Sequence, residues 1–361
     1  MGGLWRWWCC LGVHRRIVSQ RFAASRRRDT QAGMQDILSV TIPFFALVAC
    51  GYAAARFQVL PETAIPGLNA FVLYFALPCM LFRFGLRTPV LELLNPAVLG
   101  VYTVVALIIV AFTLAVTLGP QVHLKDGAFG ALVAAFPNTG FMGVPLLISL
   151  LGPQAAGPLI CVLMADLFIT SSLCLALAQL HDGHDGGQAS AAGRRALAWR
   201  VMKGPLSNPL PWAIVCGAGF AVFGWTLSGP PEVVVRMLGD AASPVALFTI
   251  GAVLWHAGHQ AQTRTPVSQY LPVALIKLLL HPLLVLLMSG VAHQLGAPLS
   301  GFQVLVMTLA AALPSASNVS LLAVKFKADN GRVARIILSS TLLAFVSFSL
   351  LASAFGVRPV G

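Results

Sequence analysis

Apolar residues occur along this chain in long runs separated by short polar stretches. Each run is about 20 residues long, which lets a helix cross a hydrocarbon core of roughly 30 Å. The runs lack the alternation of apolar and polar residues that a membrane β-barrel requires. The pattern predicts ten membrane-spanning helices, over residues 37–56, 67–86, 97–119, 127–151, 157–180, 208–227, 233–257, 270–294, 301–325 and 333–355.

The only long polar connection runs from His181 to Pro205 and follows the fifth predicted helix. It divides the chain into an N-terminal extension (1–33), a first five-helix repeat (34–180), a linker loop (181–206) and a second five-helix repeat (207–361).

The two halves match at a constant offset of 166 positions over their first two helices. Farther on, Ala134–Pro137 resembles Ala311–Pro314 at an offset of 177. A repeat with an odd number of spans enters the membrane from the opposite side the second time, so the sequence predicts inverted topology. Identical residues at the first offset are Pro43 and Pro209, Cys50 and Cys216, Gly51 and Gly217, Pro78 and Pro244, and Gly85 and Gly251.

Composition agrees with a membrane protein, since hydrophobic residues make up 58% of the chain and charged residues only 9%. A soluble domain carries roughly a quarter charged residues. The net charge of +12 comes from Lys and Arg that lie mainly between apolar runs or in the first 33 residues. Orientation in the membrane explains this charge better than a nucleic-acid partner, which we do not expect.

Basic residues between the spans predict which side faces the cytoplasm. From residue 34 on, one side carries eleven and the other only four, so both termini should lie outside the cytoplasm and the linker inside. The eleven are Arg56, Lys125, Arg194, Arg195, Arg200, Lys203, Arg264, Lys325, Lys327, Arg332 and Arg335, and the four are Arg83, Arg87, Arg236 and Arg358.

The first 33 residues carry seven further arginines, which this orientation would place on the translocated side. They are rich in Arg and poor in acidic residues, like a targeting peptide, but lack a clear apolar region and cleavage site. We expect that the natural chain starts at Met34 and that the upstream stretch is untranslated or unstructured.

Two predicted spans carry helix-breaking residues near their centres. Pro137 is followed by Asn138, Thr139 and Gly140, while Pro314 occupies the corresponding position of the ninth span. Proline and glycine weaken helix continuation, and unwound backbone inside a membrane is tolerated where it lines a cavity or is satisfied by other protein groups. Two such half-helices meeting at mid-membrane would favour a carboxylate. The candidate substrate-binding residues are therefore Pro137, Asn138, Thr139, Gly140, Pro314, Ser315, Ser317 and Asn318.

At these positions the sequence resembles the auxin efflux carrier family, which includes bacterial malonate and malate permeases and lies near the bile acid/sodium symporters. The resemblance covers roughly residues 34–355 and rests on Pro43 and Gly51, on Leu77-Pro78 with Phe82, on Pro137-Asn138-Thr139-Gly140 with Gly143 and Pro145, and on Pro314-Ser315-Ala316-Ser317-Asn318. It implies ten helices in two inverted repeats, a crossing of helices four and nine, and transport of organic anions. The absence of a large soluble central loop favours a small metabolite over auxin.

Ionisable residues inside spans are functional candidates by default. Asp166 has no cation within one helical turn, so we expect it to lie away from cations and to exchange a proton. Lys277 shares a helix face with His281 and either extends to the membrane interface or attracts anions. These two residues, Asp166 and Lys277, are the candidates for ion coupling. Asp240 is expected to pair with Arg236, four residues earlier.

These features predict an all-α integral membrane protein with broken crossover helices four and nine. The predicted function is secondary transport of a small mono- or dicarboxylate through the bacterial inner membrane, without a cofactor or metal. A proton or sodium ion would supply coupling, the lipid bilayer is the other partner, and a homodimer is compatible with the sequence. A bile acid/sodium symporter-like carrier is the main alternative, followed by a channel or an intramembrane enzyme.

Overall fold

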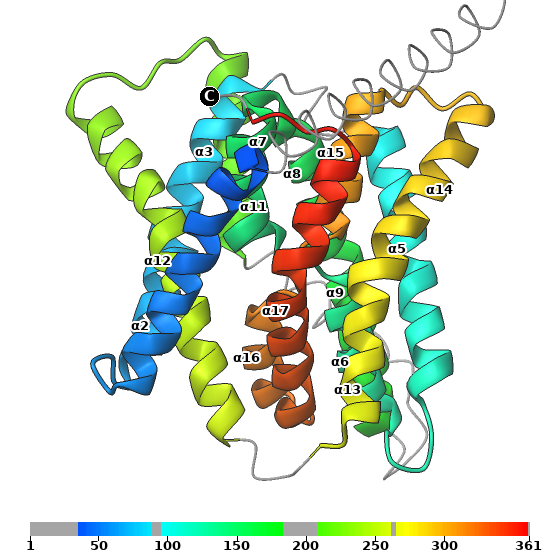
Figure 1. Cartoon of the computed structure of the whole chain (residues 1–361). Coiled ribbons are helices and arrows are strands. Elements are labelled where there is room, and N and C mark those ends of the chain that lie inside the picture. Colours follow the sequence, from blue (N-terminus) through cyan, green and yellow to red (C-terminus); the bar gives the residue numbers. More distant parts are fainter. Residues whose placement is uncertain (1–34, 89–94, 183–207, 261–264, 360–361) are drawn as a thin grey trace, which may run out of the picture.

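The computed structural model describes residues 35–88, 95–182, 208–260 and 265–359. Within these ranges the regular structure is helical, apart from two isolated β-bridges. The helices run mostly along one common direction, as Figure 1 shows. The predicted N-terminal extension and nearly all of the predicted linker lie outside the described residues.

The first half of the chain contains a helix over Gln35–Arg56 and then a long helix made of α2, a π-helical turn and α3. A third helix, α5, begins after Asn95, whose side chain accepts hydrogen bonds from two backbone amides of its first turn. The fourth helix of this half is interrupted, and the fifth is continuous through a π-helical turn. The bounds are α2 Ala64–Phe71, α3 Leu77–Arg87, α5 Pro96–Thr117, α6 Leu124–Ala135, α7 Val144–Leu151, α8 Ala156–Met164 and α9 Ser171–Asp182.

The second half repeats this order of long and interrupted helices. Asn208 caps its first helix, and Ser300 with Gln303 forms a capping box at the start of α15. The bounds are α11 Pro209–Val222, α12 Pro230–Gln260, α13 Val267–Leu275, α14 His281–Gln294, α15 Gly301–Ala311, α16 Asn318–Lys325 and α17 Asn330–Ala354.

Seven helices of the described residues are long and apolar enough to cross a membrane. Three shorter apolar helices accompany them, over Thr139–Leu151, Pro209–Val222 and Gly301–Ala311. Two of these three are parts of the fourth and ninth predicted spans, which are short because each span is interrupted near its centre. The fold is therefore an all-helical membrane bundle, and the count of ten spans stays a prediction.

Prolines account for three of the π-helical turns. The turns Val72–Ala76, Thr139–Gly143 and Ile276–Leu280 each end two residues before a proline. A proline lacks an N–H and its ring clashes with the carbonyl four residues earlier, which a wider turn relieves. A fourth π-helical turn, Ala165–Thr170, contains Asp166 and has no proline following it.

Close helix packing depends on the glycines found at the 166-residue offset. A Cβ atom on Gly51 would lie 1.8 Å from the carbonyl oxygen of Phe248, and one on Gly251 would lie 1.9 Å from that of Val48. The first helix and α12 therefore touch backbone to backbone, as small residues permit in membrane helices.

The same contact recurs between α3 and α11. A Cβ atom on Gly217 would lie 2.2 Å from the carbonyl oxygen of Phe82, and one on Gly85 would lie 2.6 Å from that of Ile214. Gly51 corresponds to Gly217 and Gly85 to Gly251, so each contact joins one helix from each half of the chain. The second helix of each half therefore packs against the first helix of the other half, so the two halves are not separate units.

We expect Gly217→Ala to destabilise the protein by about 1–3 kcal/mol, because the added methyl group would force α11 away from α3. Thermal unfolding of the purified protein in detergent, followed by tryptophan fluorescence, measures the change. Gly219→Ala is the matched control, since a Cβ at that position of the same helix meets nothing within 4 Å. Equal stability of the two variants would contradict the close contact.

Candidate functional site

The centre of the bundle contains two interrupted helices. In the first, α6 ends at Ala135, Phe136 is extended, and helical structure resumes at Thr139. In the second, α15 ends at Ala311 and α16 begins at Asn318. The interruptions predicted from Pro137 and Pro314 are therefore present.

The two interruptions cross and bind each other through the backbone. The amide of Asn138 donates to the carbonyl of Pro314 at 2.8 Å, and the amide of Ala316 donates to the carbonyl of Phe136 at 3.0 Å. Together they form a short antiparallel bridge between Pro137 and Ser315. Backbone N–H and C=O groups that have no partner within their own helix thereby form hydrogen bonds with each other, as buried backbone groups require.

Ser315 is hydrogen-bonded within the crossing. Its hydroxyl donates to the carbonyl of Val133 at 2.7 Å, and its amide donates to the Ser340 hydroxyl at 3.2 Å. The prediction that Ser315 contacts substrate therefore has little support from its bonding. Ser317 is nearly buried and precedes the first turn of α16, with no side-chain cap bond.

Three polar side-chain atoms at the crossing are buried without a partner in the described part of the chain. They are Oδ1 of Asn138, Oγ1 of Thr139 and Oδ1 of Asn318. Buried polar atoms nearly always have hydrogen-bond partners, and a bound ligand, ion or water is one way to satisfy an orphan atom. The crossing thus presents unused acceptors at the point where the helices break.

A cavity of about 360 Å³ opens beside the crossing. Asn318 lies in its wall, as does Phe136, which precedes Pro137. A cavity of this size suits a small ligand. The other wall residues are Asn69, Leu73, Phe141, Leu167, Ser171, Leu175, Asn208, Leu321, Leu322 and Lys325.

The cavity adds residues that the sequence did not identify. Asn69, Ser171 and Asn208 offer polar groups, and Lys325 offers a cation that would favour an anionic ligand. Of the predicted substrate-binding residues, only Asn318 is in this wall. The others, Pro137, Asn138, Thr139, Gly140, Pro314, Ser315 and Ser317, lie in or beside the crossing behind it.

A second polar cluster is sealed among α5, α15 and the two π-helical turns over Ala165–Thr170 and Ile276–Leu280. Asp166, Lys277 and His281 each have 0% exposed surface. The Lys277 ammonium lies 3.1 Å from Nδ1 of His281 and donates to the carbonyl of Ala311 at 2.7 Å. The expectation that Lys277 might reach the membrane interface is therefore wrong.

Asp166 and Lys277 interact electrostatically, so the expectation that Asp166 lies away from cations is also wrong. One oxygen of Asp166 accepts from the Thr170 hydroxyl at 3.4 Å, and the Tyr102 hydroxyl also interacts with this carboxylate. The sequence could not show the interaction between Asp166 and Lys277, since the two residues lie on helices from different halves of the chain.

The cluster is connected directly to the crossing. Ala311 is the last residue of α15, where the negative end of the helix dipole favours a cation. Lys277 occupies that position. A change of charge at Asp166 or Lys277 would therefore alter the interaction that holds one half-helix of the crossing.

Asp240 also differs from its prediction. Its carboxylate pairs with Arg83 of α3 at 2.6 Å, across two helices, and not with Arg236 of its own helix.

The chain is similar to transporters over almost its whole described length. The family model described as "Membrane transport protein" matches residues 36–352. A Rhizobium meliloti (strain 1021) protein named "Putative malonate transporter" is 29% identical over 315 residues, covering 86% of this chain and 93% of the relative.

Two more distant relatives are also named as transporters. An "Uncharacterized transporter" of Methanothermobacter thermautotrophicus is 26% identical over 318 residues, covering 88% of this chain and 96% of the relative. "Auxin efflux carrier component 8" of Arabidopsis thaliana is 23% identical over 301 residues, covering 69% of this chain and 80% of the relative.

Proposed function

Because this chain belongs to the membrane transport protein family, which includes the auxin efflux carriers, we propose that it is a secondary transporter of a small organic anion. It carries a mono- or dicarboxylate across the membrane by alternating access. Malonate is the first candidate, since the named malonate transporter of Rhizobium meliloti is similar along almost its whole length.

The observation that carries this proposal is the crossing of the two broken helices beside a cavity. Amide and hydroxyl groups of Asn138, Thr139 and Asn318 are buried there, with acceptor atoms that no described residue uses. Each amide side chain also carries an N–H₂ donor, which suits a carboxylate. Lys325 adds positive charge to the cavity wall.

The crosswise glycine contacts support the further proposal of two inverted five-helix repeats. Corresponding glycines of the two halves make equivalent backbone contacts with the opposite half. Such a pseudo-two-fold arrangement gives the crossing two related routes of access, one toward each side of the membrane. In the proposed orientation both termini lie outside the cytoplasm, in the inner membrane of a bacterium.

Asp166 and Lys277 are the proposed coupling residues. Both are fully buried, they interact electrostatically, and Lys277 binds the end of α15 at the crossing. Uptake or loss of a proton at Asp166 would change the electrostatic attraction between Asp166 and Lys277. It would thereby change the strength of the hydrogen bond from Lys277 to the Ala311 carbonyl at the end of α15. Buried acid–base pairs of this kind form proton relays in transporters.

A sodium-coupled carrier is the second candidate, because the unpaired side-chain oxygens of Asn138, Thr139 and Asn318 are of the hard type that binds such cations. Replacing external sodium by choline separates the two cases. Uptake should persist if a proton is the coupling ion and fall if sodium is.

We expect Asn318→Ala and Asn138→Ala each to weaken malonate binding roughly 5- to 150-fold, which corresponds to the loss of one buried hydrogen bond of about 1–3 kcal/mol. Affinity and thermal stability are measured on the same purified sample. If the residues only support the fold, stability falls while the affinity of the folded protein remains that of the wild type.

Asn330→Ala provides the matched control for this experiment. The Asn330 amide accepts a hydrogen bond from the Ser320 hydroxyl at 2.6 Å and lies outside the cavity wall. Its replacement should change stability without a change in malonate affinity.

We expect Asp166→Asn to retain exchange of labelled for unlabelled malonate in vesicles but to lose stimulation of uptake by a pH gradient. The amide mimics the protonated acid permanently, so the attraction to Lys277 no longer changes with proton binding. Gradient-driven uptake equal to that of the wild type would remove Asp166 from the coupling mechanism.

A further inference from the structure

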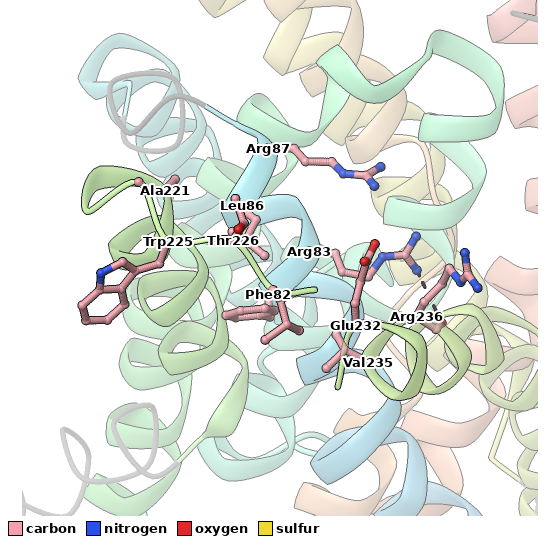
Figure 2. A pocket seen from close by; sticks show the side chains of 12 residues that line it. Phe82, Arg83, Leu86, Arg87, Ala221, Trp225, Thr226, Glu232, Val235 and Arg236 are labelled. Carbon is pink, nitrogen blue, oxygen red and sulfur yellow. Dashed lines mark hydrogen bonds between the residues drawn. The ribbon is translucent and has the colours of Figure 1, made fainter. Parts of the chain in front are cut away.

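A second hollow lies on α3 and α12, at the end of the bundle near α7 and the C-terminus (Figure 1). Its volume is about 450 Å³, and Arg83, Arg87 and Arg236 all line it. Figure 2 shows the three guanidinium groups extending to the same side, away from Trp225. Three cations that gather in this way form a local positive field.

The position of these arginines is unusual for their side of the membrane. From residue 34 on, only four basic residues lie at this end of the predicted spans, and three of the four line this one hollow. In the proposed orientation this is the outer side, where basic residues are disfavoured, so topology does not explain the group.

The bonding of the three arginines leaves positive charge unused. Arg83 pairs with Asp240 at 2.6 Å and its Nη1 also lies 3.5 Å from the carbonyl of Arg236. The guanidinium groups of Arg87 and Arg236 make no hydrogen bond or ion pair within the described ranges, and Glu232 is the one acidic side chain in the lining. Two guanidinium groups therefore remain open to a ligand.

A smaller hollow of about 280 Å³ connects this group to the first broken helix. Arg83 and Arg87 line it together with Pro145, Ile148 and Ser149 of α7, the second half of that helix. Arg83 and Arg87 thus face the second half of the helix that contains the first interruption. A ligand bound to these two arginines would therefore lie beside α7.

We propose that Arg83, Arg87 and Arg236 form an outer anion-binding site that holds the dicarboxylate substrate before it reaches the crossing. The inference rests on the proposed function and narrows its substrate class to dianions. A guanidinium group takes a carboxylate through two parallel N–H bonds, so Arg87 and Arg236 can each hold one carboxylate of the same molecule.

The test compares malonate uptake by vesicles containing the wild type, Arg87→Gln or Arg236→Gln. Each variant should raise KM about two- to fivefold and leave kcat unchanged, as expected for the loss of one partly exposed charge contact. The increase should shrink at high external salt, which screens exposed charges. The increase in KM should also be smaller when acetate, which carries one negative charge, replaces malonate as the substrate.

Arg358→Gln is the matched control, because it removes an exposed arginine at the same end of the bundle but outside both hollows. Its KM should equal that of the wild type. A KM unchanged in Arg87→Gln and Arg236→Gln, or raised equally in Arg358→Gln, would overturn the site.

Vesicle composition separates the substrate from a lipid headgroup. The KM increase should be the same in vesicles of neutral phospholipid alone and in vesicles with anionic phospholipid. An increase seen only with anionic phospholipid would assign the arginines to a lipid phosphate and overturn the inference.

Failure of the outer site differs from failure of the proposed function in the same vesicles. If wild-type uptake saturates and Asn318→Ala loses it, while the two arginine variants behave as wild type, only the outer site is wrong. If the wild type shows no saturable uptake, the transport proposal is wrong. A thermal shift with malonate that the Arg87→Gln/Arg236→Gln double variant retains would then also overturn the outer site.

Discussion

The two backbone hydrogen bonds between the broken helices are the constraint on which the rest of the structure depends. An unpaired amide or carbonyl in the membrane interior costs several kcal/mol, so a helix can unwind there only if another group takes its bonds. Here Asn138 and Pro314, with Ala316 and Phe136, satisfy each other. Because each break supplies the partners of the other, the two halves of the chain must fold together. The side-chain oxygens of Asn138 and Asn318 take no part in these bonds and remain for other partners.

The surrounding helices hold this crossing from two directions. Crosswise glycine contacts bring the first helix onto α12 and α11 onto α3. Asn69 and Leu73 of the cavity wall lie on the long helix that continues into α3, and Asn208 of the wall caps α11. On the other side, Lys277 binds the end of α15 and interacts with Asp166. In the proposed mechanism the glycine-packed helices stay fixed. The cluster of Asp166 and Lys277 links a buried charge to the position of α15. The cavity with Lys325 and the hollow with Arg87 then offer positive charge on the two sides of the crossing.

The sequence predicted the features that depend on local chemistry. Apolar run lengths gave the helices, Pro137 and Pro314 gave the interruptions, and the constant offset identified the glycines that turned out to pair. It did not predict which helices are neighbours, because hydrophobic periodicity carries no information on partners in a membrane where every face is apolar. For that reason the ion pair of Asp240 with Arg83 and the electrostatic interaction of Asp166 with Lys277 were missed. Lys325 was missed for another reason, since a basic residue that sets topology and one that lines a cavity look identical in sequence.

The central claim is that a small dicarboxylate binds in the cavity beside the crossing during transport. The most direct measurement is the alkylation rate of a single cysteine at position 69, which lines the same cavity as Asn318, in a variant without the native cysteines. Malonate should slow alkylation several-fold, with half of the effect at the concentration that half-saturates uptake, and neutral malonamide should have no effect. An alkylation rate that saturating malonate leaves unchanged, in vesicles that transport malonate, would contradict the account.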